Sequence, residues 1–341
     1  MRGKGLNCIS VLAVLLVLSP LRVSARDVPE QADLDVTEII YEHTGDAYFW
    51  HKVPLPVIVR SRTTGWHVFL ASSLPCAGFE MAGEDSPYAG KVVENTPDGP
   101  VRPADLSITR NVLSLLFSSL LLVVLILLTA RWYRRHDVLH ETPTGIAALL
   151  EPVIVMIEDE VIKEAVGPDY KRYSPYLLTA FFFILLSNLL GILPVFPGGA
   201  NLTGNIAVTF VLAMCTFIAT NVFGSRHYWK DIFWPDVPVF LKVPLPLMPL
   251  IELIGIFTKP FSLMIRLFAN IFAGHAMLIG LLCVIFVTAK MEPVINGSMM
   301  AVSVLLGVFM DCLEVLVAFI QAYVFTMLSA VFIGASRQTN H

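Results

Sequence analysis

The chain of 341 residues is too apolar and too sparsely charged for a soluble protein, because 56% of its residues are hydrophobic and 15% are charged. Average soluble domains are about 45–50% apolar and about 25% charged. Its 23 lysines and arginines against 27 aspartates and glutamates give a net charge of −4, so the basic excess typical of nucleic-acid binding is absent. The same figures exclude disordered, coiled-coil and collagen-like chains. We therefore expect an all-α integral membrane protein.

The first segment, 1–25, has the pattern of an export signal peptide. Arg2 and Lys4 give it a positive start, and Val23–Ala25 forms a small-residue cleavage site. The apolar run between them, Ile9–Leu18, is too short to span about 30 Å of hydrocarbon comfortably. An uncleaved anchor is the alternative. In either case we expect the following segment to lie outside the cytoplasm.

Residues 26–107 are polar and rich in turn-forming residues. Val57–Val59 and Trp66–Leu70 have the alternation of short strands. The histidines of this region do not have the spacing of a tight metal-ligand motif, so we expect no metal and no other cofactor. The pattern predicts a small extracytoplasmic N-terminal domain.

The predicted membrane domain, 108–341, begins with Asn111–Ala130, an uncharged run long enough for one helical span. Three arginines within 131–135 follow it, so the positive-inside rule places this end in the cytoplasm. Beyond them, Thr144–Ala165 mixes acidic residues with apolar residues at helical spacing. That mixture predicts an amphipathic helix on the cytoplasmic membrane surface.

Two more spans are predicted at 176–193 and 205–223, within an uncharged stretch that prolines and glycines divide. The short loop between them has no lysine or arginine. Basic residues lie beyond the outer ends of both spans: Lys171, Arg172, Arg226, Lys230 and Lys242. This distribution places the loop outside and both flanks inside.

The last two apolar segments are longer than a bilayer requires. Pro244–Ala289 would be about 69 Å long as one helix, more than twice the hydrocarbon thickness. It is either two spans or one long, strongly tilted helix. Val294–Ala335 is similarly long, and two such segments in succession favour a tilted hairpin. With one crossing each, the chain has about five crossings, an extracytoplasmic N-terminus and a cytoplasmic C-terminus.

Five ionisable side chains lie within this hairpin: Glu252, Arg266, His275, Asp311 and Glu314. An arginine at the centre of a membrane helix costs about 2.5–3.5 kcal/mol, so these groups must face a partner or water. Arginine keeps its proton in proteins, whereas glutamate and histidine exchange theirs.

Along the first hairpin helix, Glu252 precedes Arg266 by about 21 Å and His275 follows by about 13 Å. A titratable group on each side of a permanent cation predicts two proton half-paths that an electrostatic barrier separates.

Three motifs of this region resemble those of subunit a of the F-type ATP synthase. They are RLFANIFAGH at 266–275, EVLVAFIQAYVF at 314–325 and SNLLGILP at 187–194. The resemblance covers about 110–337. The N-terminal region lies outside the common core and is similar to the exported extension of some bacterial members. The resemblance implies a bacterial inner-membrane protein.

The resemblance also implies roles for single residues. Arg266 would match the arginine that faces the rotating c-subunit ring, and His275 with Glu314 would line the outer half-channel. Glu252 would match the acidic group of the inner half-channel.

Asn270 and Gln321 would match the polar neighbours of the arginine. Asp311 has no counterpart in the family pattern; it is either a second channel carboxylate or a solvated group. Asn188 either lines the channel or bridges helices.

We therefore expect a proton-channel stator that has the c ring, b stalk subunits and the catalytic head as partners. We do not expect it to be an enzyme by itself, since it has no Gly-rich phosphate loop with its lysine. A stand-alone ion channel or secondary transporter is the first alternative, although no internal repeat is evident. An intramembrane enzyme and an inert assembly protein are the others.

Overall fold

The structure is a computed structural model that describes residues 45–50, 53–61, 65–75, 78–83, 88, 90–96, 99–136, 141–193, 199, 202–233, 247–288 and 293–337. The predicted signal peptide at 1–25 lies outside these residues. The described residues form two compact units, one within Tyr41–Phe117 and the other within Ser118–His341. The domain boundaries predicted after residues 25 and 107 stay predictions.

The smaller unit, called the β unit below, is built from short antiparallel strands. They are β1 (Phe49–Trp50), β2 (Val53–Pro54), β3 (Pro56–Ser61), β4 (Gly65–Leu70), β5 (Phe79–Met81), β6 (Val92–Thr96), β7 (Gly99–Val101) and β8 (Ala104–Asp105). Two three-stranded sheets have the orders β4-β3-β8 and β5-β6-β7. The strands expected at Val57–Val59 and Trp66–Leu70 are confirmed as parts of β3 and β4.

One face of each of these sheets contributes to the core of the β unit. Val57 and Val59 of β3 are fully buried, together with Phe79 of β5. The ring of Phe69 on β4 stacks on Phe79 at 5.5 Å, and His67 meets the same ring edge-on at 5.4 Å. His67 is therefore a half-buried packing residue.

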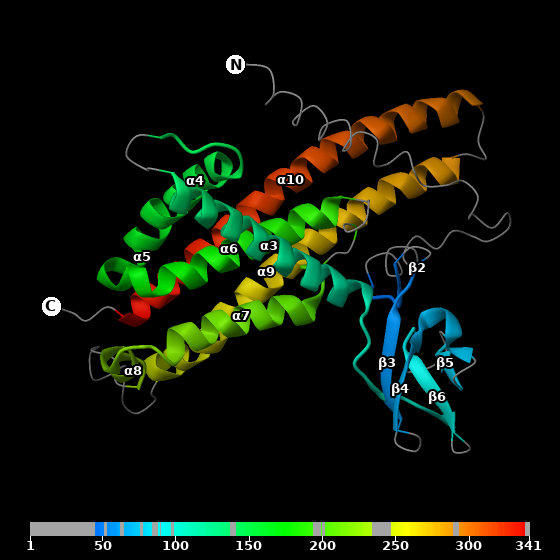
Figure 1. Cartoon of the computed structure of the whole chain (residues 1–341), viewed down its shortest axis with the longest axis horizontal. Helices are drawn as coiled ribbons and strands as arrows, with labels where there is room; N and C mark the ends of the chain where they lie inside the picture. The colour runs from blue at the N-terminus through cyan, green and yellow to red at the C-terminus, as the bar shows by residue number, and fades with distance from the viewer. Residues whose placement is uncertain are drawn as a thin grey trace. The chain divides into compact units, whose positions relative to one another are not determined.

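The larger unit, called the helical unit below, consists mainly of long helices (Figure 1). The chain forms α3 (Arg110–Arg135), α4 (Ile146–Met156), a π-helical stretch (Ile157–Lys163), α5 (Glu164–Val166), a 3₁₀ turn (Gly167–Asp169), α6 (Tyr170–Ile192), α7 (Ile206–Asn221), α8 (Arg226–Phe233), α9 (Leu247–Thr288) and α10 (Pro293–Arg337). The first turns of α3 belong to the β unit. Figure 1 shows α9 and α10 side by side, and α6 also packs on α10.

Four helical stretches of the described chain are long and apolar enough to cross a membrane: Arg110–Arg135, Ile146–Ile192, Pro249–Ile285 and Gly297–Arg337. The second one turns at Gly167, whose φ of 76° ends α5 before α6 begins. The predicted span at 205–223 is the shorter apolar helix α7, with 16 residues. At 1.5 Å per residue α7 is about 24 Å long, so it is shorter than the other spans. The expected all-α membrane architecture is confirmed.

The two long segments are the expected hairpin of single helices. α9 runs unbroken past Pro260 for 42 residues, and α10 follows with 45 residues. The alternative of two short spans in place of α9 is therefore wrong.

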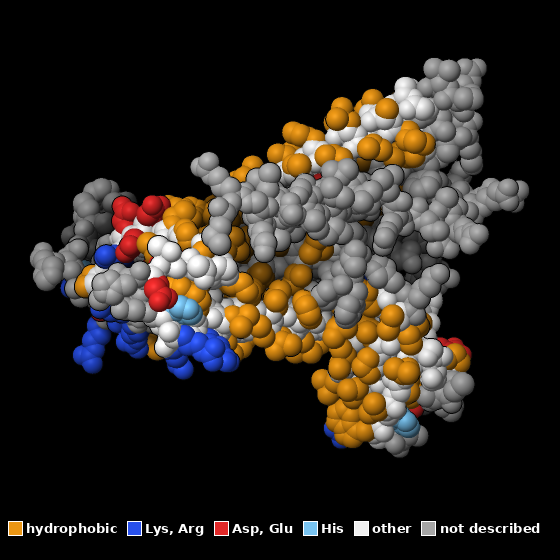
Figure 2. Space-filling model, turned by 45° about the horizontal axis from the view of Figure 1, so that its top comes forward, with side chains coloured by type: hydrophobic (Ala, Val, Ile, Leu, Met, Phe, Trp, Pro, Cys, Tyr) orange, Lys and Arg blue, Asp and Glu red, His pale blue; other side chains and the backbone are white. Residues whose placement is uncertain are grey.

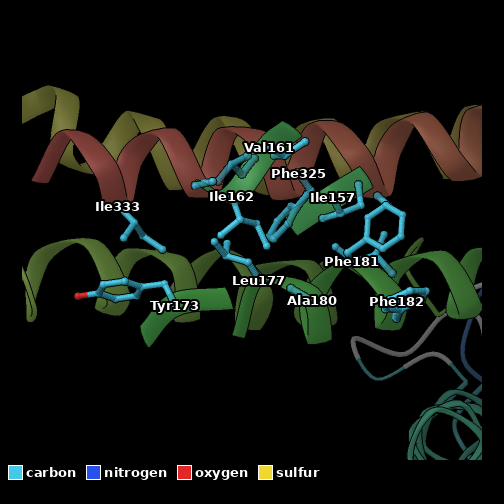
Figure 3. Close-up of a cluster of buried hydrophobic side chains, with 14 of the residues drawn as sticks. Ile157, Val161, Ile162, Tyr173, Leu177, Ala180, Phe181, Phe182, Phe325 and Ile333 are labelled. Atoms are coloured by element: carbon cyan, nitrogen blue, oxygen red, sulfur yellow. The ribbon is translucent and has the colours of Figure 1, made fainter. Parts of the chain in front are cut away.

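The helical, amphipathic character of the predicted segment is confirmed at α4, the π-helical stretch and α5, whereas its place on the cytoplasmic membrane surface stays a prediction. Its acidic residues Glu158, Asp159 and Glu160 flank a buried side formed by Ile157, Val161 and Ile162. Figure 3 shows these apolar side chains between α6 and α10, against Leu177 and Phe325. The segment thus packs on the helical unit through its apolar side.

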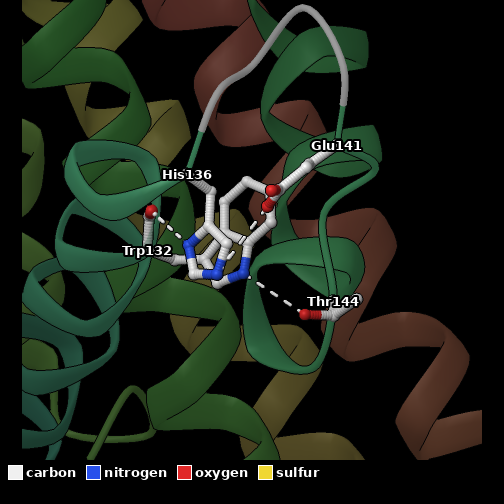
Figure 4. Close-up of polar contacts among 4 residues, drawn as sticks. All are labelled: Trp132, His136, Glu141 and Thr144. Carbon is white, nitrogen blue, oxygen red and sulfur yellow. Dashed lines mark hydrogen bonds and ion pairs between the residues drawn. The ribbon is translucent and has the colours of Figure 1, made fainter.

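Aromatic and polar contacts join the end of α3 to the start of α4 (Figure 4). Trp132 stacks on His136 at 4.6 Å between ring centroids and donates its indole N–H to Thr144 Oγ1 at 3.2 Å. His136 Nε2 lies 3.9 Å from Glu141 Oε2. These contacts fix the chain on both sides of the α3–α4 connection.

The last turns of α10 contact the backbone of two other segments of the helical unit, α5 and the residues before α8. Ser225 donates its N–H to the carbonyl of Ser336 at 2.9 Å, and Arg337 forms a 3.0 Å ion pair with Asp169. A methyl group on Gly334 would lie 2.0 Å from the carbonyl oxygen of Ala165. Only glycine therefore allows α10 to approach α5 so closely.

We expect Gly334→Ala to lower the free energy of unfolding by about 1–3 kcal/mol, because the backbone of α5 must shift. Denaturant unfolding in mixed micelles, or the amount of subunit retained in membranes, measures this effect. Gly307→Ala on the same helix is the control, since no atom lies within 4 Å of its added carbon. Equal stability of the two variants would contradict the contact.

Candidate functional site

His275 of α9 and Glu314 of α10 face each other across the hairpin. His275 Nδ1 lies 2.5 Å from Glu314 Oε1, and the two side chains are only 15% and 6% exposed. The second carboxyl oxygen, Oε2, is buried and has no hydrogen-bond partner among the described residues. The pair therefore has both a short hydrogen bond and a free oxygen that can hold a proton.

Gly274 makes room for this contact. A Cβ at this position would lie 3.2 Å from Glu314 Oε1, tighter than most carbon contacts in proteins. The small residue beside His275 therefore lets the carboxylate reach α9. Sequence reasoning did not single out Gly274, although its place beside the histidine in the motif was a usable signal.

Asn270 and Gln321 form a second polar contact between the same helices. Asn270 Nδ2 donates to Gln321 Oε1 at 2.8 Å, and Gln321 is only 3% exposed. This hydrogen bond holds α9 to α10 one turn after Arg266. The sequence placed both residues near the arginine but did not indicate that they bind each other.

Arg266 is the cation of this region, and its side chain is exposed on α9. It has no hydrogen bond or ion pair with any residue that the structure describes. Leu263, three residues earlier, and Leu267, the next residue, are buried, so Arg266 lies at the edge of the buried side of α9. The exposed side chain of Arg266 is therefore accessible to another molecule.

Glu252 lies near the start of α9, close to α8. Burial, with the nearby Glu252 carboxylate as a second cause, raises the pKa of the Tyr228 phenol on α8. Tyr228 donates a hydrogen bond to Asn221 Oδ1 at 3.1 Å. A small cavity beside these residues is lined by Thr216, Thr220, Asn221, Tyr228 and Lys259 among others. Glu252 thus lies near a cluster of polar side chains at the start of α9, whereas His275 lies in the second half of the helix.

Asn188 of α6 is buried and bridges three segments. It donates to the carbonyl of Ala318 on α10 at 3.5 Å and accepts a 2.6 Å hydrogen bond from Thr203. The expected bridging alternative is therefore present; a channel-lining role stays a prediction. Asp311 is buried three residues before Glu314 on α10, and its role also stays a prediction.

A chain of hydroxyl groups crosses three helices and was missed by sequence reasoning. Thr216 of α7 lies 2.9 Å from the Tyr176 hydroxyl and 3.1 Å from the Ser329 hydroxyl. Thr216 and Ser329 are almost fully buried. Polar residues within apolar spans were the available signal, but their mutual contact depends on the packing of α6, α7 and α10.

These observations define a multi-pass membrane protein in which two long helices hold ionisable side chains between them and leave Arg266 exposed. The chain belongs to the ATP synthase A chain family, whose match covers residues 115–334. That match includes both polar contacts of the hairpin and Arg266. The membership indicates a subunit of the ATP synthase instead of a stand-alone transporter.

Curated relatives agree with this membership. The chain is 39% identical over 248 residues to ATP synthase subunit a of Pelodictyon phaeoclathratiforme, covering 71% of this chain and 69% of the relative. It is 39% identical over 303 residues to ATP synthase subunit a 2 of Chlorobium luteolum, covering 83% and 85%. With ATP synthase subunit a of Myxococcus xanthus the identity is 38% over 283 residues, covering 81% and 84%.

The hydrogen bond between Asn270 and Gln321 predicts an energetic coupling of about 1 kcal/mol in a double-mutant cycle. Asn270→Ala, Gln321→Ala and the double variant are compared by denaturant unfolding in mixed micelles. A cycle of Asn270→Ala with the distant Thr288→Ala is the control and should be additive. Coupling indistinguishable from this control would mean that the contact contributes nothing.

Proposed function

We propose that this chain is the proton-channel stator of an ATP synthase, and that Arg266 faces a carboxylate of the rotor c ring. The observation that carries this proposal is the exposed Arg266 without a partner in the described chain, on a helix apolar enough to cross a membrane. A foreign carboxylate at about 4 Å would contribute roughly 4 kcal/mol at an effective dielectric near 20, enough to offset the cost of insertion.

The two polar groups on α9 lie on opposite sides of Arg266 and suit the two half-channels. His275 with Glu314 would load the rotor carboxylate, because the pair holds a proton-accepting oxygen without a partner. Glu252 would receive the proton on the other side, next to Tyr228 and its cavity. Arg266 keeps its charge and would block direct leakage between the two. Asp311 and Asn188 are candidates for further channel-lining positions.

The remaining partners and the orientation are part of the same proposal. The b stalk subunits and the catalytic head would hold the chain against the rotor, and catalysis would take place in the head. Figure 2 shows basic side chains gathered at one end of the helical unit. The start of α6 and the end of α10 bring basic residues together, since Arg172 and Arg337 both lie over the ring of Tyr173. By the positive-inside rule this end would face the cytoplasm of a bacterium, with the chain in the inner membrane.

We expect Arg266→Ala to lower coupled ATP synthesis about tenfold or more, since roughly 4 kcal/mol of attraction to the rotor carboxylate is lost. ATP synthesis by membrane vesicles under an imposed proton gradient measures it, with immunoblots for the subunit and the c ring.

Lys163→Ala is the control for this variant. Lys163 is another cation of the helical unit, but it pairs with Asp159 at 3.3 Å and lies outside the proposed half-channels. We expect it to retain most of the activity. Unchanged synthesis in Arg266→Ala would overturn the stator assignment.

We expect Glu314→Gln to slow proton flow through the complex about tenfold or more, because the amide has the shape of the carboxyl group but cannot take up a proton. Passive proton conductance of vesicles stripped of the catalytic head measures this step. Wild-type conductance would remove Glu314 from the path.

A pair of glycine variants provides the geometric control. Gly274→Ala presses on Glu314 Oε1, whereas Gly280→Ala on the same helix meets no atom within 4 Å. We expect the first to reduce conductance and the second to leave it unchanged. Equal conductance would show that the close approach of Glu314 to α9 does not matter for the flow.

A further inference from the structure

The β unit has an apolar outer face on the sheet β4-β3-β8. Along β4, His67 and Phe69 turn toward the core, whereas Trp66, Val68 and Leu70 are 57%, 71% and 49% exposed. Figure 2 shows hydrophobic side chains gathered over part of the β unit.

The neighbouring strands extend this face. The register pairs Ile58 with Val68 and Arg60 with Trp66, so β3 adds one apolar and one basic side chain. Leu106, directly after β8, bonds to the Ile58 carbonyl and is 64% exposed. We call Trp66, Val68, Leu70, Ile58 and Leu106 the apolar sheet face.

This face is unlike that of a sheet exposed to water. An antiparallel sheet with one side on the core normally has polar residues on the other side. Contiguous exposed apolar surface marks a contact with another apolar partner. The apolar sheet face therefore needs an apolar partner. Its position in the chain, close to the start of α3, indicates what that partner is.

Hydrogen bonds within the β unit hold the start of α3, a helix long enough to span a membrane, to the sheet and to the residues before β1. Ile108 donates its N–H to Pro56 at 3.1 Å, Arg110 donates to Ala47 at 2.9 Å, and the Asn111 N–H bonds the Asp46 carboxylate at 3.1 Å. Strands of six residues are about 20 Å long, so the whole face stays within about that distance of the start of α3.

The first turns of α3 belong to the β unit and already have an apolar surface. Val112 and Leu116 are 40% and 52% exposed there. An exposed apolar surface on a helix long enough to span a membrane thus begins in the same unit as the apolar sheet face, six residues after Leu106. The membrane is the apolar surface that this arrangement brings within reach.

The side chains on the sheet also suit the boundary between headgroups and acyl chains. The guanidinium of Arg60 lies over the ring of Trp66 at 5.6 Å from its centroid. Tryptophan is enriched at that depth, and arginine binds phosphate groups there.

We propose that the apolar sheet face rests on lipid, at the surface of the leaflet from which α3 emerges. Trp66, Val68 and Leu70 enter the headgroup region, and Arg60 binds a lipid phosphate. The β unit then lies on the membrane surface and does not project into water.

Photo-crosslinking in the assembled complex tests this proposal. Val68→p-benzoylphenylalanine is made in the full chain, membranes are irradiated, and mass spectrometry identifies what is attached. Because Val68 is mostly exposed, the substitution leaves the core of the β unit intact. We expect a phospholipid adduct, and the same adduct from Leu106→p-benzoylphenylalanine on the same face.

Two control positions make the result decisive. Leu116→p-benzoylphenylalanine within α3 gives the yield expected for lipid contact, and Glu80→p-benzoylphenylalanine on the exposed side of β5 gives the background. Lipid yields at 68 and 106 close to that at 116 support the proposal. Yields no higher than that at 80 overturn it. An adduct with another polypeptide at 68 also overturns it, in favour of a protein interface.

Discussion

The guanidinium of Arg266, which forms no ion pair with the part of the chain that the structure describes, is the constraint on which the arrangement of the helical unit depends. A permanent charge on an apolar helix needs a partner or water, so the surface of α9 around Arg266 cannot be covered by apolar side chains alone. Asn270 lies one turn after Arg266 and bonds Gln321 of α10, and His275 with Glu314 forms a second contact between the same helices. These two contacts hold α9 to α10 and leave the Arg266 side chain exposed.

The hairpin keeps its polar groups at separate levels because α9 is one helix. A break in α9 would let the segments with Glu252 and His275 approach each other, whereas an unbroken helix holds them about 34 Å apart along its axis. Gly274 and Gly334 allow close contacts of α10 at two places. The absence of a side chain at Gly274 lets Glu314 of α10 approach α9, and its absence at Gly334 lets α10 approach the backbone of α5.

The sequence alone predicted the helices well because hydrocarbon imposes uncharged runs of sufficient length, as at Asn111–Ala130 and in the two long segments. It predicted His275 and Glu314 as a pair only through family resemblance. Helical phase gives the face on which a residue such as Asn270 lies, but not which residue of another helix meets it. The hydroxyl contact of Thr216 with Ser329 likewise depends on packing that no local pattern encodes.

Pro260 makes one part of α9 easier to bend than the rest. Proline has no amide hydrogen, so the carbonyl of Ile256 lacks its usual helical hydrogen bond, and α9 bends most easily near Pro260. A bend at Pro260 would move Arg266 together with the part of α9 that Asn270 and His275 join to α10. Glu252 lies before the proline, near Tyr228 of α8. Such a bend would therefore change the position of one charged group relative to the other.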